Sequence, residues 1–242
     1  MKTFTFSVRT FKEIIRDPLN IAFGLGFPLV LIFLLSAIQA NVPVSLFEIE
    51  TLTPGITVFG LSFMTLFSST LVSRDRESAL LRRLYTTPLT AWDFILGYVL
   101  PILPIAVCQS VVCYIAAVAL GLKITVNILF AVIAIIPVSL LFVTLGLLFG
   151  SILGVKQVGG VCGALLTNLT AWLSGVWFDL KLVGGAFEKI AYCLPFVHAV
   201  ELERAVLSGQ TEGVLLHLAV VLAYTVPIAA LAAALFCRQM KK

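Results

Sequence analysis

Six stretches of this sequence each run for more than twenty residues without an Asp, Glu, Lys or Arg. A helix of that length spans the hydrocarbon core of a bilayer. The chain is 60% hydrophobic and 12% charged, and a soluble fold of 242 residues cannot bury so much apolar surface. The uninterrupted runs also differ from the roughly ten-residue alternating strands of a membrane barrel. We therefore predict an all-α integral membrane protein, whose backbone groups are paired within each span.

Helix-start signals divide the chain into elements. Asp17 precedes Pro18, Thr53 precedes Pro54, and residues 90–93 have the form of a capping box. We predict one transmembrane domain over residues 1–242, with six spans at 17–39, 54–73, 94–120, 126–150, 156–177 and 213–236. The segment 178–212 mixes short apolar pieces with charges, so we expect it to lie at the outer surface or to dip into the membrane without crossing it.

The first sixteen residues have the pattern of an amphipathic helix. At 100° per residue, one apolar stripe contains Phe4, Val8, Phe11 and Ile15. The other side carries charged residues, and Phe6 is the exception to the stripe. These charged residues are Lys2, Arg9, Lys12, Glu13 and Arg16. This pattern predicts a helix lying in the plane of the lipid headgroups. The alternative is a cationic N-terminal arm without fixed structure.

The segment 74–93 carries the densest charge in the chain. Its candidate site residues, which combine charges with an apolar helical face and end at a proline, are Arg74, Asp75, Arg76, Glu77, Leu80, Leu81, Arg82, Arg83 and Pro88. A charged helix with an apolar face requires a partner, so we interpret this segment as a docking surface. The alternative is a loop that only sets the membrane topology.

Lys and Arg are distributed unevenly across the predicted topology. With six spans and the N-terminus inside, twelve of the sixteen Lys and Arg lie in the inner segments. This asymmetry satisfies the positive-inside rule. Both termini and the 74–93 segment are therefore predicted to face the cytoplasm, with the chain in the cell membrane.

Apart from Asp17 and Lys156, which stand at the first positions of their spans, the predicted spans contain no Asp, Glu, Lys or Arg. Because buried ionisable groups form the relays of many ion-coupled carriers, their absence argues against proton coupling. The five Cys are scattered singly, which indicates neither a metal site nor a disulfide framework. The sequence has no phosphate-binding loop and no convincing catalytic constellation, so we expect no bound cofactor and no enzymatic activity. An ATP-independent carrier or channel, and a membrane-embedded enzyme or assembly factor, remain alternatives.

Gly146, Gly150 and Gly154 recur at every fourth position near the end of the fourth predicted span. Small residues at this spacing allow helices to approach closely. We expect them to support packing within the chain, and a subunit interface is the alternative.

Three patches of the sequence resemble the ABC-2 family of ABC transporter permeases. The patches are Lys12 to Leu19, then Ser73 to Leu84 followed by Thr87-Pro88-Leu89, and finally Leu173 to Phe178 with Leu194-Pro195-Phe196 and Arg204. The chain departs from the family pattern at Ala79-Leu80, where Gly-Thr is common, and at Asp179, where Pro is common.

The resemblance implies a role for each region. The 74–93 segment would hold the coupling helix that docks into a separate ATPase, and the N-terminal helix would be the connecting helix beside it. Two cytoplasmic ATPase subunits would bind ATP and Mg²⁺, and a second permease subunit, identical or homologous, would complete an exporter. Because the spans offer apolar walls, we expect an amphipathic or hydrophobic substrate such as a drug, a peptide or a lipid-linked molecule.

Overall fold

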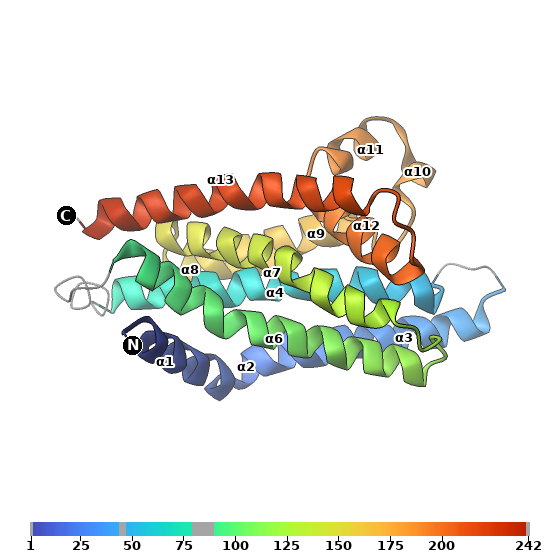
Figure 1. Cartoon of the computed structure of the whole chain (residues 1–242), viewed down its shortest axis with the longest axis horizontal. Coiled ribbons are helices and arrows are strands. Elements are labelled where there is room, and N and C mark those ends of the chain that lie inside the picture. The colour runs from blue at the N-terminus through green and yellow to red at the C-terminus, as the bar shows by residue number, and fades with distance from the viewer. Residues whose placement is uncertain (1, 44–46, 79–89, 241–242) are drawn as a thin grey trace.

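The structure is a computed structural model that describes residues 2–43, 47–78 and 90–240. Within these ranges every regular element is a helix and no strand occurs. The long helices lie along one axis, and the N- and C-termini share one end of the bundle (Figure 1). We call this end the termini end and the opposite end the far end.

The helices among the described residues range in length from 4 to 29 residues. Their bounds are α1 Lys2–Arg16, α2 Pro18–Ile21, the π-helical turn η1 Ala22–Gly26, α3 Phe27–Asn41, α4 Ile49–Glu77, α6 Ala91–Ala119, α7 Asn127–Ile152, α8 Val155–Val158, the π-helical segment η2 Gly159–Leu166, α9 Thr167–Leu173, α10 Leu180–Val183, α11 Gly185–Tyr192, α12 Pro195–Ser208 and α13 Val214–Met240.

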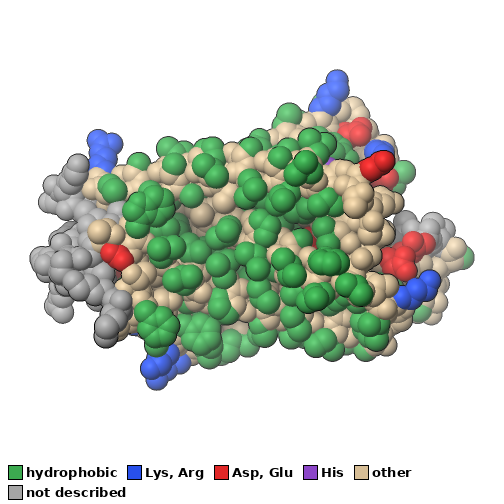
Figure 2. Space-filling view, viewed as in Figure 1, with side chains coloured by type: hydrophobic (Ala, Val, Ile, Leu, Met, Phe, Trp, Pro, Cys, Tyr) green, Lys and Arg blue, Asp and Glu red, His purple; other side chains and the backbone are tan. Residues whose placement is uncertain are grey.

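Five helices among the described residues are long and apolar enough to cross a membrane. They cover Pro18–Asn41, Ile49–Glu77, Trp92–Ala119, Asn127–Ile152 and Val214–Arg238. Hydrophobic side chains cover the long flank of the molecule, and the charged side chains in view lie toward its two ends (Figure 2). This distribution matches a slab of hydrocarbon around the middle of the bundle. The chain is a multi-pass membrane protein.

The predicted span at 156–177 does not appear among these five helices. Residues 155–173 are continuously helical through α8, η2 and α9. Lys156 and Gln157 at its beginning and Asn168 within it make this run less apolar than the others. The count of six spans therefore depends on a crossing by residues 155–173, which belongs to the proposed topology.

Two of the sequence-derived helix starts are confirmed and one is wrong. Asp17 caps α2 by accepting a hydrogen bond from the Leu19 amide at 3.1 Å. The Thr90 and Asp93 side chains form a reciprocal capping box at the start of α6. Pro54, by contrast, lies inside α4, which begins at Ile49. A proline cannot donate to the carbonyl four residues earlier, but its fixed φ fits a helix, and packing around α4 supports the longer element.

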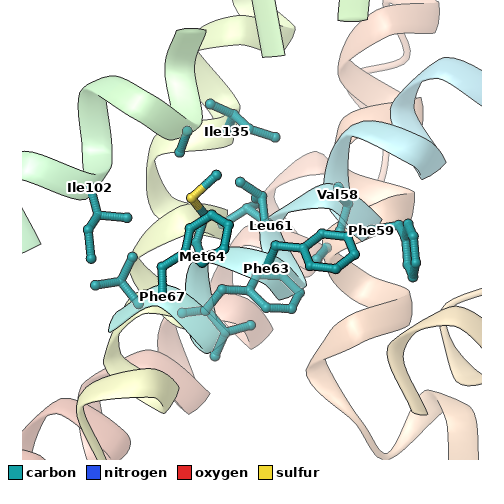
Figure 3. Close-up of a cluster of buried hydrophobic side chains, with 14 of the residues drawn as sticks. Val58, Phe59, Leu61, Phe63, Met64, Phe67, Ile102 and Ile135 are labelled. Atoms are coloured by element: carbon teal, nitrogen blue, oxygen red, sulfur yellow. The ribbon is translucent and has the colours of Figure 1, made fainter. Parts of the chain in front are cut away.

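Helix α4 forms the centre of the bundle, and almost all of its apolar stretch is buried. Its side chains Val58, Phe59, Leu61, Phe63, Met64 and Phe67 meet Ile102 from α6 and Ile135 from α7 in one cluster (Figure 3). A helix buried on all sides is expected to be apolar all round. The low charge of α4 outside its last turn follows from this position.

The glycine row of α7 packs against α4 within the same chain. A Cβ atom at Gly150 would lie 2.7 Å from the Ser69 carbonyl oxygen, and one at Gly146 would overlap the Ser68 hydroxyl. The Thr65 hydroxyl donates to the Phe142 carbonyl at 2.7 Å across the same contact. Gly154, beyond the end of α7, faces the Glu77 carboxylate. The glycines therefore bring α7 close to α4, not to the helix that follows α7 in sequence.

Residues 178–212 form short helices at the far end. α10 and α11 project beside α13, whereas α12 packs in among α4, α7 and α13 (Figure 1). The 14 residues of α12 extend about 21 Å, which is too short to cross a bilayer. α12 therefore enters the bundle from the far end without traversing it.

Candidate functional site

The 74–93 segment begins on the last turn of α4 and ends on the first turn of α6, both at the termini end. The structure describes Arg74 to Ser78 and Thr90 to Asp93 of it. The predicted site residues Leu80, Leu81, Arg82, Arg83 and Pro88 lie outside the described residues. The contacts of the candidate site can therefore be described for its charged first residues, Arg74 to Glu77.

Asp75 forms the most connected part of this site. Its carboxylate is almost completely buried and accepts two hydrogen bonds from the Arg9 guanidinium, at 2.7 and 2.8 Å. The Tyr98 hydroxyl donates a third, at 2.7 Å. Hydrogen bonding to Asp75 raises the pKa of Arg9 above its ordinary value, so the guanidinium stays charged. This group joins α1, the end of α4 and the beginning of α6.

Arg76 and Glu77 connect the same turn to α7 and α8. The Arg76 guanidinium donates to the carbonyl groups of Ser151 and Leu153, which stand at the C-terminal end of α7. The Glu77 carboxylate accepts a hydrogen bond from the Val155 amide at 2.9 Å. A cation at a helix C-terminus and an anion at a helix N-terminus both complement the helix dipole. The two side chains therefore fix the α7–α8 connection to the end of α4.

Further contacts extend this network to the first helices. The Arg74 guanidinium lies 4.0 Å from the carboxylate of Asp17, the residue that caps α2. At the other end of the segment, Asp93 accepts a hydrogen bond from the Thr3 hydroxyl near the start of α1. Each of the four charged residues 74–77 therefore contacts a different neighbouring element. A displacement of this turn would act on α1, α2, α6, α7 and α8 together.

Helix α1 uses a different face for packing than its apolar stripe. Phe6 and Ile14 are buried along with Ser7 and Thr10, and α1 packs along α6. The Phe6 ring contacts the Phe94 and Tyr98 rings edge-on, with centroids 5.9 and 5.0 Å apart. The predicted stripe remains at the surface, with Phe4, Phe11 and Ile15 exposed and Val8 partly exposed. That this stripe lies in the plane of the lipid headgroups stays a prediction.

Sequence reasoning missed the two partners of Asp75. It assigned Arg9 to a polar face directed at headgroups and gave no role to Tyr98. The sequence feature that points to these partners is Phe6, an aromatic residue outside the stripe. Its position indicates a second contact surface on the helix, one turn from Arg9. Gly97 opposite it is the complementary signal, because a Cβ atom there would overlap the Phe6 ring.

The profile of the family described as ABC-2 type transporter matches residues 1–207, which include α1, the site at the termini end and nearly all of α12. The chain belongs to the ABC-2 type transporter family. No curated protein gives a significant match to it. As an ABC-2 family member, the chain is a membrane component of transport, and the family implies association with an ABC ATPase.

At the far end of this ABC-2 protein, Arg204 of α12 joins three elements. Its guanidinium donates to the Thr51 carbonyl at 3.3 Å and to the Gly175 carbonyl at 2.9 Å. It also pairs with Glu201 one turn earlier, at 3.1 Å. Thr51 lies in the first turn of α4, and Gly175 lies two residues after the end of α9. The end of α4 that is opposite the candidate site is therefore tied to α12.

Proposed function

We propose that this chain is the permease subunit of an ABC exporter, driven by a separate ATPase that docks at residues 74–93. The observation that carries the proposal is the charged turn 74–77, whose side chains contact α1, α2, α6, α7 and α8. A docking surface transmits force only when it is connected to the elements that must move. This turn has such connections, and it ends α4, the central helix of the bundle.

The termini end is proposed to face the cytoplasm, with the chain in the cell membrane. It carries the basic face of α1 and the beginning of the 74–93 segment, and the excess of Lys and Arg in these segments supports that orientation. Residues 155–173 would then form the sixth crossing, which returns the chain to the far end for α10 to α12. This topology brings α13 back to the cytoplasm.

The complete transporter is proposed to contain two permease subunits, identical or homologous, and two ATPase subunits. ATP and Mg²⁺ would be bound by the ATPase subunits, because the present sequence has no phosphate-binding loop. Closure of the ATPase dimer would displace the two 74–93 segments. Each permease would then change from an inward-open to an outward-open arrangement. The ATPase can drive this change only if it binds the two arrangements with different affinity.

An amphipathic or hydrophobic substrate fits the surfaces that the chain offers. A cavity of about 270 Å³ lies between α1, the beginning of the first span and α6, and its lining is almost entirely apolar. Phe11, Ile21 and Pro104 are among its lining residues, with Asn20 as a polar exception. Apolar pockets with few polar groups suit ligands of this class. We include drugs, peptides and lipid-linked molecules in it.

The test is to purify the chain from membranes, identify an ABC ATPase that co-purifies, and reconstitute both. We expect the permease to stimulate ATP hydrolysis, and we expect Glu77→Gln to reduce this stimulation by about fivefold or more, the range of a coupling energy of 1–3 kcal/mol. Glu188→Gln at the far end is the matched control. Equal stimulation by the wild type and both variants would remove the docking role, and the absence of any stimulation would remove the ATPase partnership.

A further inference from the structure

Glu203 of α12 is a buried carboxyl group for which the proposed transport cycle gives no role. Its side chain has no exposed surface. One carboxyl oxygen, Oε2, accepts a hydrogen bond from the Tyr114 hydroxyl of α6 at 3.3 Å. The other, Oε1, has no hydrogen-bond partner among the described residues. The same described residues place no Lys, Arg or His in an ion pair with Glu203.

The elements packed against α12 offer few other ionisable groups. The sequences of α7 and α9 contain none. At the far end, α4 contributes Glu50, α6 contributes Tyr114 and Cys113, α11 contributes Glu188, Lys189 and Tyr192, and α13 contributes His217 and Tyr224. The connections beside α12 contribute Lys123, Cys193 and Glu212. On α12 itself, Glu201 pairs with Arg204, and His198 is hydrogen-bonded to His217. Tyr114 is therefore the ionisable side chain in contact with Glu203.

This environment favours the neutral carboxyl group. An ionised carboxylate buried without a cation or sufficient hydrogen bonds is strongly disfavoured, and a single hydrogen bond from a hydroxyl does not compensate for the lost water. Burial accordingly raises the pKa of Glu203 well above its ordinary range, and the Tyr114 hydrogen bond opposes this only in part. Glu203 therefore holds a proton while α12 is packed in place.

Water is close to this site once α12 moves. Tyr114 lies five residues before the end of α6 at Ala119, about 8 Å of helix from the far end. α12 ends at Ser208, the next residue Gly209 has a positive φ of 74°, and residues 208–210 are exposed. The Arg204 contacts to Thr51 and Gly175 hold α12 at the same end, and water can replace such contacts. An opening of the far end would therefore hydrate Glu203.

We propose that Glu203 is a proton-binding site that is occupied while the far end is closed and releases its proton to the outer water when the far end opens. The carboxyl group gives up H⁺ and becomes a hydrated carboxylate, and reclosure takes up one proton. The inference rests on the proposed function, because far-end opening is its outward-open step. Opening releases a proton, so a higher outer pH favours the open arrangement and a lower outer pH favours the closed one.

The first experiment measures the protonation state of the full chain in lipid nanodiscs by infrared spectroscopy at about pH 7.5, far above the usual carboxyl pKa. We expect a protonated-carboxyl band in the wild type and in the control Glu201→Gln, and we expect Glu203→Gln to remove it. Glu203→Gln preserves the shape of the side chain, and its melting temperature verifies folding. If a folded Glu203→Gln protein and the wild type show the same spectrum in this region, Glu203 is ionised and the proposal is overturned.

The second experiment measures opening by amide hydrogen exchange of α12, corrected for the intrinsic pH dependence of exchange, between about pH 5.5 and about pH 7.5. We expect the open population of the wild type to rise by up to tenfold per pH unit, the limit for one proton, and that of Glu203→Gln to stay constant. A wild type with no pH dependence would overturn the release step. Both experiments use the permease alone, so failure to find an ATPase would refute the proposed function separately.

Discussion

Among single side chains, Asp75 has the largest consequence for the candidate site. Its buried carboxylate is satisfied by Arg9 and Tyr98 together, and each partner comes from a different helix. Removing the charge of one member of a largely buried pair leaves the other without its partner. The Arg9 side chain is partly exposed, so water would recover part of the loss.

We therefore predict that Asp75→Asn destabilises the protein by about 2 kcal/mol, the cost of unpairing a charged hydrogen bond at a partly hydrated site. The expected result is a lower melting temperature in lipid nanodiscs and weaker protection of α1 from hydrogen exchange. Glu212→Gln, in the exposed turn before α13, is the control and should leave both quantities unchanged. Equal melting temperatures for the wild type and Asp75→Asn would show that α1 is held by its apolar contacts alone.

Between elements, the α4–α7 contact depends on the absence of side chains. Gly150 lies against the backbone of α4, and a Cβ atom would approach Ser69 and Val72 within 3 Å. Gly160, in the helical run that follows, has no atom within 4 Å of its ideal Cβ position in the described structure. The two glycines therefore form a matched pair for testing close packing against ordinary helix propensity.

We predict that Gly150→Val lowers stability by about 1–3 kcal/mol, because overpacking forces the two backbones apart. Gly160→Val should cost no more than a few tenths of a kcal/mol, since valine favours a helix slightly more than glycine does. Denaturation in mild detergent measures both. If Gly160→Val is the more destabilising substitution, the Gly160 face contacts another subunit. The α4–α7 packing at Gly150 would then contribute less to stability than that contact.

The existence of the long helices could be predicted from the sequence, because absence of charge over twenty residues is a local property. The capping residues Asp17 and Thr90 are also local, and both were predicted correctly. Pro54 shows the limit, since a rule about helix starts did not anticipate that packing around α4 extends the helix to Ile49.

Contacts between distant residues could not be predicted in the same way. The Phe6 ring packs against the Cα atom of Gly97, where there is no side chain, and Asp75 is bonded to Arg9. Both contacts join two different helices, so the periodicity of residues within one helix does not predict them. The burial of Glu203 could not be predicted for the same reason. The segment 178–212 mixes short apolar pieces with charges, and packing of α12 among other helices buries this one carboxyl group completely. The sequence interpretation considered buried charges only within the predicted spans, and Glu203 lies outside them.

For the whole molecule, the two ends of α4 have complementary connections. At the termini end its last turn contacts α1, α6, α7 and α8, and at the far end Thr51 is bonded to Arg204 of α12. A buried, closely packed helix transmits displacement because it cannot be compressed easily. α4 therefore connects the proposed ATPase contact to the proposed exit and to Glu203.

The proposal that an ATPase docks at residues 74–93 is tested most directly by locating the ATPase on the permease. A photo-crosslinking amino acid is placed at Ser78, the exposed residue that ends α4, or at Gln210, an exposed residue of the far end. After illumination of intact membranes, we expect the Ser78 variant to form a covalent adduct with an ABC ATPase subunit and the Gln210 variant to form none. An adduct at Gln210, or none at Ser78 while the complex still co-purifies, would contradict it.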